Sequence, residues 1–219
     1  MVCPIIIVLE GAVAAGKSHL FEKLKNKLQG PEYCFMSEPD FTYISLSEKT
    51  YNPLFEIYQS SEASDSYVCT QQYITRTLSD FYFEQWKNAP ITIMDRSILS
   101  CEYFIRLRKH MKLITTYTQD CLLEEVKHYQ EIFLKLVEGT KTYYCLLDTP
   151  PEQSSLNVFK RGRPEETTNK SIDYWKKFNK DYVNIIKSYS PKIDFQGNDK
   201  ELENIILTLC KTALGETKV

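Results

Sequence analysis

The sequence is short of net positive charge, of paired cysteines and of glycine. Its 27 lysines and arginines are outnumbered by 29 aspartates and glutamates, so no net positive field would hold a nucleic-acid backbone. The seven cysteines include no Cys-x-x-Cys pair and are odd in number, which argues against a zinc ribbon and a disulfide framework. Only 7 glycines and 9 prolines are spread along the chain, and no linker or low-complexity segment divides it. We therefore expect no nucleic-acid partner and a reducing compartment.

Long hydrophobic runs are missing as well. The N-terminus leads directly into the apolar run Ile5–Leu9, with no basic leader or small-residue cleavage site, and no apolar run reaches the roughly 18 residues of a membrane span. The sequence therefore predicts a cytoplasmic protein with no membrane partner. Its 219 residues, of which 42% are hydrophobic, suit one domain over residues 1–219.

Apolar runs of strand length alternate with amphipathic stretches of helix length. The expected strands are Ile5–Leu9, Tyr33–Met36, Ile91–Met94, Thr142–Leu147 and Ile193–Phe195. The expected helices are Lys17–Leu28, Tyr67–Trp86, Ile98–Lys112, Leu122–Leu136, Glu152–Phe159, Ile172–Ser188 and Lys200–Leu214. This alternation is typical of a parallel sheet covered by helices. The sequence therefore predicts an α/β fold with a five-stranded parallel sheet and helices on both faces.

The first strand leads into a phosphate-binding pattern. The segment reads Gly11, Ala12, Val13, Ala14, Ala15, Gly16, Lys17 and Ser18. It matches G-x-x-x-x-G-K-[ST] between a strand and a helix, which is the context that the pattern needs. Backbone N–H groups and the helix N-terminus would hold a β-phosphate, Lys17 would bridge the β- and γ-phosphates, and Ser18 would hold Mg²⁺. Residues 11–18 are therefore predicted to bind a nucleoside triphosphate.

This pattern is shared by switch GTPases, motor ATPases and small-molecule kinases. A GTPase would need an N-K-x-D guanine reader, and neither residues 169–172 (NKSI) nor residues 179–182 (NKDY) supply it. A motor would need a larger chain. A kinase would need a carboxylate base after the second strand, an arginine after the third and a basic lid near the C-terminal third.

All three kinase features occur in the sequence. Glu38 follows the second strand and Arg96 the third, at the carboxyl edge where open α/β sheets bind ligands. Residues 159–166 (FKRGRPEE) supply the basic lid, at about residues 160–167. With NPLFEIY, QQY and TPPE segments in order between them, these motifs resemble the deoxynucleoside kinase family, of the thymidine kinase or multisubstrate type within the P-loop kinase superfamily. The resemblance spans about residues 5 to 185.

The resemblance implies transfer of the γ-phosphate of ATP to the 5′-hydroxyl of a deoxynucleoside. Glu38 would accept the proton of that hydroxyl, and Arg96 would steer it. Arg161 and Arg163 would close over the transferring phosphoryl group and offset its charge, with Lys17 on the donor phosphates.

Metal and donor positions are also implied by the resemblance. Asp95 would join Ser18 at Mg²⁺. Asn157 stands where the family commonly has an arginine against the donor base, so the donor would be gripped by fewer cation–π contacts. The family also tends to form homodimers through helices, and we expect a homodimer here.

The nucleoside positions favour a pyrimidine. By resemblance, Tyr58 and Glu166 would bind the sugar 3′-hydroxyl, Tyr43 would wall the nucleoside and Gln71 would read the base edge. The residues that would form an apolar wall for a thymine methyl are Ile74, Leu78 and Cys101. Thymidine or another pyrimidine deoxynucleoside is therefore the expected substrate. The resemblance implies an aromatic residue at position 105. This chain has Ile105 there, and Phe104 stands one position before it.

Two other functions remain as alternatives. Thymidylate kinase shares the fold and a D-R motif, but it phosphorylates a monophosphate, which the Glu38 carboxylate would repel. A non-catalytic nucleotide-binding module would need the phosphate loop alone.

Overall fold

The computed structural model describes residues 4–38, 65–167, 170–190 and 192–215. Its centre is a five-stranded parallel sheet in the order β2-β3-β1-β4-β5. The strands are β1 (Ile5–Gly11), β2 (Tyr33–Met36), β3 (Ile91–Asp95), β4 (Lys141–Leu147) and β5 (Phe195–Gly197). The predicted α/β class and parallel sheet are confirmed.

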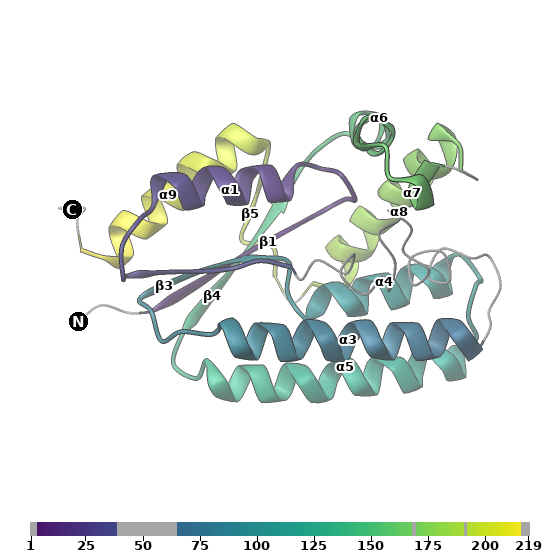
Figure 1. Cartoon of the computed structure of the whole chain (residues 1–219), viewed down its shortest axis with the longest axis horizontal. Helices are drawn as coiled ribbons and strands as arrows, with labels where there is room; N and C mark the ends of the chain where they lie inside the picture. The colour runs from purple at the N-terminus through teal and green to yellow at the C-terminus, as the bar shows by residue number, and fades with distance from the viewer. Residues whose placement is uncertain (1–3, 39–64, 168–169, 191, 216–219) are drawn as a thin grey trace.

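Helices cover both faces of the sheet (Figure 1). They are α1 (Lys17–Lys27), α3 (Asp65–Gln85), α4 (Leu99–His110), α5 (Thr116–Leu136), α6 (Pro151–Arg161), α7 (Pro164–Thr167), α8 (Ile172–Tyr189) and α9 (Asp199–Ala213). α1 and α9 lie on one face and α3, α4 and α5 on the other, while α6, α7 and α8 lie beyond the carboxyl ends of the strands (Figure 1). Within the described ranges, no helix combines the length and the apolar character needed to cross a membrane.

Strand β1 shows why a central strand reads as a continuous apolar run. Ile5, Ile7 and Leu9 pack among side chains of α1 and α9. Ile6 and Val8 face the opposite way, into the core formed with α3, α4 and α5. Because successive side chains of a strand point to opposite faces, a sheet covered on both sides needs apolar residues at every position.

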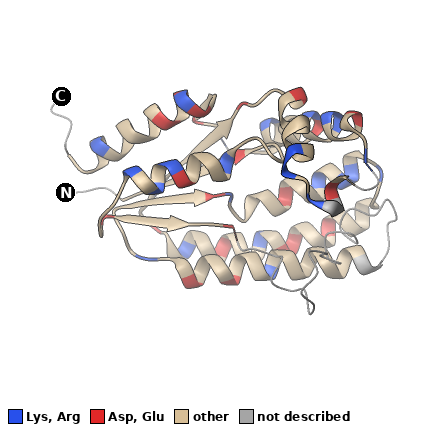
Figure 2. Ribbon diagram, turned by 45° about the horizontal axis from the view of Figure 1, so that its top comes forward, with Lys and Arg blue, Asp and Glu red and all other residues tan. Residues whose placement is uncertain are grey.

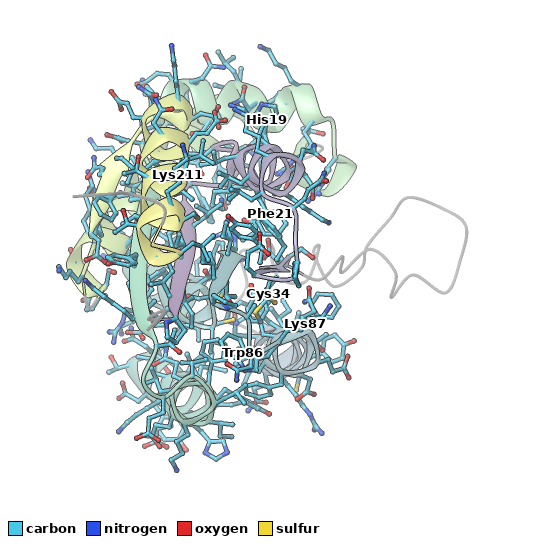
Figure 3. The ribbon with its side chains drawn as sticks, turned by 90° about the vertical axis from the view of Figure 1, so that its left-hand side faces the viewer. His19, Phe21, Cys34, Trp86, Lys87 and Lys211 are labelled. Atoms are coloured by element: carbon cyan, nitrogen blue, oxygen red, sulfur yellow. The ribbon has the colours of Figure 1, made fainter. Side chains whose placement is uncertain are left out.

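The side chains between α1 and the sheet illustrate this packing. Phe21 points from α1 toward the sheet (Figure 3), where its ring meets Phe35 of β2 edge-on at a centroid distance of 5.6 Å. Trp86, which directly follows α3, makes a similar edge contact with Phe133 of α5 at 6.1 Å. Lysines, arginines and acidic residues are interspersed along the outer helices (Figure 2).

Two element boundaries differ from the sequence-based prediction. Strand β5 begins two residues later than expected, at Phe195, because the Asp194 carboxylate accepts the hydrogen bond of the Tyr144 N–H at 2.9 Å. Helix α5 begins at Thr116 rather than at Leu122, because Thr115 Oγ1 accepts a hydrogen bond from the Thr118 N–H at 3.0 Å and caps the helix.

The lid contains a short helix that was not predicted. Gly162 ends α6 in the left-handed region at φ +68°, and the chain turns there into the four-residue α7. The polar stretch of the lid lacks the apolar periodicity by which longer helices are recognised.

Candidate active site

The phosphate loop joins β1 to α1 at the carboxyl edge of the sheet. A Cβ added at Gly11 would lie 3.0 Å from the carbonyl oxygen of Leu147 in β4, so a larger residue would crowd that strand. Gly16 precedes α1 at φ +104°, and the first turn of α1 contains no acidic residue. The N-terminus of α1 is therefore suited to an anion.

Lys17 is buried at the start of α1. Its Nζ donates to the carbonyl oxygens of Gly11 at 3.1 Å and Ala12 at 2.9 Å. Burial, helped by the nearby Arg96 charge, lowers the pKa of Lys17 to about 7, although the surrounding carboxylates oppose this. A phosphate group would favour the charged form and draw the ammonium group away from the loop carbonyls.

Oxygen donors for a metal lie beside this lysine. Ser18 Oγ donates to Asp95 Oδ2 at 2.7 Å, while the buried Asp95 Oδ1 has no hydrogen-bond partner among the residues that the structure describes. Mg²⁺ prefers oxygen ligands and needs only one or two from the protein when it also binds substrate phosphates. The unsatisfied carboxylate oxygen and the serine hydroxyl fit that requirement.

Glu38 and Arg96, which are predicted to contact the acceptor hydroxyl, lie next to each other. Glu38 Oε2 lies 3.4 Å from Arg96 Nε, and the Glu38 side chain is 40% exposed because it faces the cavity described below. The cavity walls limit hydration of the carboxylate and raise the pKa of Glu38, while Arg96 opposes that rise. A carboxylate with a raised pKa is a stronger base once ionised.

The backbone and neighbours of Arg96 hold its guanidinium in place. Arg96 adopts a left-handed conformation at φ +69°, and its Nη1 donates to Tyr182 Oη of α8 at 2.8 Å. The rings of Phe104 and Tyr182 stack at 4.5 Å, and the guanidinium lies 5.2 Å from the Phe104 centroid. Phe104 lines the cavity, whereas Ile105 is fully buried in the core, so Phe104 supplies the aromatic wall.

Glu10 is a buried acid beside Arg96 that was not predicted from the sequence. It is 2% exposed at the end of β1, where its Oε1 accepts a hydrogen bond from Ser100 Oγ at 2.5 Å. Its Oε2 lies 3.6 Å from Arg96 Nη1. Burial raises the pKa of Glu10, and Arg96 opposes the rise. Arg96 therefore lies between two carboxylates, Glu10 and Glu38.

The lid residues contact one another. Arg161 Nε and Nη2 donate to Glu166 Oε2 at 3.1 Å and to Glu166 Oε1 at 2.5 Å, which is a bidentate pair. Arg163 Nη1 lies 3.9 Å from the same carboxylate. Trp175 Nε1 donates to the Glu166 carbonyl oxygen at 2.8 Å. The carboxylate predicted for the sugar is thus held by an arginine predicted for the phosphoryl group.

The residues predicted to contact the base lie on α3 and α4. Gln71 is buried, its Oε1 accepts a hydrogen bond from Tyr67 Oη at 3.3 Å, and its Nε2 donates to Thr75 Oγ1 at 3.3 Å. Leu78 and Cys101 are buried in the core cluster that also contacts Ile74. Burial raises the pKa of Cys101 to about 12, which keeps its thiol neutral.

One cavity of about 410 Å³ brings most of the predicted residues together. The predicted residues that line it are Val13 to Ser18, Glu38, Gln71, Ile74, Leu78, Arg96, Cys101, Asn157, Arg161, Arg163 and Glu166. Residues lining it that were not predicted are His19, Ser100, Arg108, Tyr174, Trp175 and Phe178. Asp95 is linked to this cavity through Ser18, whereas Tyr43 and Tyr58 lie outside the described residues. Asn157 Nδ2 donates to the Ala14 carbonyl oxygen at 3.1 Å, so it contacts the phosphate loop.

Three solved structures with a similar fold are of a deoxyadenosine kinase. Deoxyadenosine kinase from M. mycoides with bound dCTP is 20% identical, covering 95% of this chain and 100% of that chain, with a TM-score of 0.66. The same enzyme with bound dATP is 22% identical, covering 94% and 99%, with a TM-score of 0.63. Its structure with the products dCMP and a flexible dCDP is 19% identical, covering 95% and 99%, also with a TM-score of 0.63.

The search of curated proteins found no match. The family model described as deoxynucleoside kinase, in contrast, matches residues 7–208, which include every described residue of the cavity. Together with this match, the phosphate loop, the Glu38–Arg96 pair and the basic lid lead to one assignment. The chain belongs to the deoxynucleoside kinase family.

Proposed function

We propose that this kinase transfers the γ-phosphate of ATP to the 5′-hydroxyl of a pyrimidine deoxynucleoside, with thymidine as its preferred substrate. The observation that carries the proposal is the Glu38–Arg96 pair, 3.4 Å apart, in the cavity that the phosphate loop also lines. A carboxylate at that place can remove a proton from a hydroxyl group, and the neighbouring cation orients both.

The proposed reaction follows from these groups. The 5′-oxygen gives its proton to a Glu38 carboxylate oxygen and forms a bond to the γ-phosphorus. The bond from that phosphorus to the β–γ bridging oxygen breaks, and its electron pair leaves with ADP. Lys17 and the lid residues Arg161 and Arg163 offset the charge on the phosphate oxygens.

Mg²⁺ fits the Ser18 and Asp95 oxygens, and when bound it would offset the charge of the donor phosphates. The protein's own part at this place is to orient the two oxygens. Ser18 lies in the first turn of α1 and Asp95 is the last residue of β3, so secondary structure fixes the positions of both.

The apolar wall supports the choice of base. Ile74, Leu78 and Cys101 line the cavity near Gln71, and a neutral thiol with two aliphatic side chains can contact a C5-methyl group. Such a contact contributes on the order of 1 kcal/mol. The Gln71 amide can both donate to and accept from a pyrimidine edge. Thymidine and deoxyuridine should therefore be good substrates, deoxycytidine a weaker one and purines the poorest.

A coupled assay of ADP release tests the proposal. The panel contains thymidine, deoxyuridine, deoxycytidine, deoxyadenosine, deoxyguanosine and thymidine monophosphate. Preference for thymidine supports the proposal, and preference for deoxyadenosine, the substrate in the name of the similar enzyme, refutes the choice of base. Turnover of the monophosphate alone would make the chain a thymidylate kinase, and silence with every acceptor would favour a non-catalytic binding module.

A further inference from the structure

Helix α8 contacts three separate parts of the active site through one face. Trp175 donates to the Glu166 carbonyl oxygen in the lid, and Tyr182 accepts a hydrogen bond from Arg96, which is predicted to contact the acceptor hydroxyl. Asn179 lies between them in the sequence and contacts the phosphate loop at Val13. Spacings of four and three residues place all three side chains on the same face of the helix.

The contact of Asn179 with the loop is made at both ends of its amide. Its Oδ1 accepts from the Val13 N–H at 3.2 Å, and its Nδ2 donates to the Val13 carbonyl oxygen at 3.2 Å. The same Nδ2 donates to Ser154 Oγ of α6 at 2.9 Å. Asn179 is completely buried, so these bonds replace water for every polar atom of its side chain.

Few side chains could make this contact. Pairing with both main-chain groups of one residue requires a donor and an acceptor side by side, which among short side chains only asparagine offers in neutral form. Residues 179–182 do not match the N-K-x-D motif that reads guanine. In the fold, Asn179 instead contacts the backbone of Val13. The neighbouring loop carbonyl oxygens accept from side chains of the β4–α6 region, Ala14 from Asn157 and Ala15 from Thr149 at 2.7 Å.

We infer that Asn179 is a positioning residue that fixes the tip of the phosphate loop for the donor nucleotide. The inference rests on the proposed function in so far as it requires a donor nucleotide at residues 11–18. Val13 lines the cavity, and the loop N–H groups must point inward to hold phosphate oxygens. Without Asn179, the N–H and carbonyl groups of Val13 would lose their partners, and the loop would have to be reordered each time a nucleotide binds.

The test compares Asn179→Leu, Asn179→Ser and Asn179→Asp with Asn184→Leu, a control at an exposed position of the same helix. Binding of ADP and of thymidine is measured by titration calorimetry, and thermal unfolding reports stability. The leucine and serine variants remove both bonds to Val13 without adding charge. Both should weaken ADP binding about tenfold or more while thymidine binding changes less than about twofold. The control should bind both ligands as the wild type does.

The other outcomes separate the inference from the proposed function. Wild-type protein that binds no ADP would refute the phosphate-loop assignment itself. Wild-type binding together with unchanged ADP affinity in a folded leucine or serine variant would overturn the inference alone. Weakening in Asn179→Asp only would also overturn it, since carboxylate–phosphate repulsion would then explain the loss. Equal loss of ADP and thymidine binding, with a lower melting temperature, would assign Asn179 a merely structural role and overturn the inference. If the leucine variant does not fold, the serine variant, with its smaller side chain, provides the test.

Discussion

Replacing Glu38 by glutamine should separate catalysis from folding in this enzyme. The amide keeps the shape of the carboxylate and can still form hydrogen bonds, but it cannot accept the 5′-hydroxyl proton. Loss of a general base costs ~10²–10⁴ in kcat, which corresponds to roughly 3–5 kcal/mol of activation free energy. The Glu38 side chain is 40% exposed, and an ion pair with such a partner contributes only about 0–1 kcal/mol to stability. The effect on turnover should therefore be far larger than the effect on unfolding.

Arg96 should remain in place when Glu38 is replaced. It keeps the Glu10 carboxylate at 3.6 Å, its hydrogen bond to Tyr182 and its contact with the Phe104 ring. Thymidine binding should accordingly change little, and the loss should appear in kcat.

The pH profile gives an independent check on Glu38. The raised pKa of Glu38 means that its base form is lost as pH falls through that pKa, so wild-type kcat/KM should rise with pH across it and then level off. The glutamine variant has no group to ionise there, and this limb of its profile should disappear. Stopped-flow or coupled ADP-release kinetics at several pH values would measure both effects. Near-normal turnover of the variant, or an unchanged acid limb, would remove Glu38 from the proposed role.

Three further predictions concern other parts of the molecule. Because the pKa of Lys17 is lowered to about 7 in the free enzyme, ADP binding should weaken as pH rises above about 7. Lys17→Ala should abolish both phosphoryl transfer and this pH dependence. Calorimetry at several pH values measures the affinity for ADP, and a constant affinity would contradict the assignment. The double substitution Leu78→Arg with Cys101→Asp should shift the kcat/KM ratio from thymidine toward deoxycytidine, and an unchanged ratio in a folded, active variant would show that these side chains do not form the base wall. Sedimentation should give a homodimer, and a single species near the 25.6 kDa chain mass would refute it.

The fold was predictable from the sequence because its strands are buried on both faces. Every residue of β1 and β3 is buried, so each reads as a short apolar run that could not be mistaken for a surface segment. The start of β5 was misplaced because a side chain, Asp194, takes a hydrogen bond that a backbone carbonyl would take in a regular ladder. The pattern of apolar residues in the sequence does not show that a side chain will replace a backbone group in a hydrogen bond.

The grouping of candidate residues in one cavity was predictable where those residues belong to one local segment. Residues 11–18 and the lid each bring several functional groups within a few positions, and order along the chain places them on one edge of the sheet. The burial of Glu10 was not predicted because an acid next to a glycine at the end of a strand is typical of a solvated turn. It is the packing of α4, with Ser100 against this carboxylate, that buries it. The contact of Asn179 was not predicted because its partner, Val13, lies 166 residues away.

The bidentate contact between Arg161 and Glu166 changes how lid variants should be interpreted. Glu166 is 2% exposed, so replacing Arg161 alone would remove the proposed phosphate ligand and would also leave a buried carboxylate without its bidentate partner, with Arg163 at 3.9 Å as the remaining arginine. The carboxylate proposed to bind the sugar would then lose its fixed position, so sugar binding should weaken together with phosphoryl transfer. The measured effect of an Arg161 substitution therefore combines the loss of the arginine with the displacement of Glu166. A double-mutant cycle with Glu166→Gln separates the two effects.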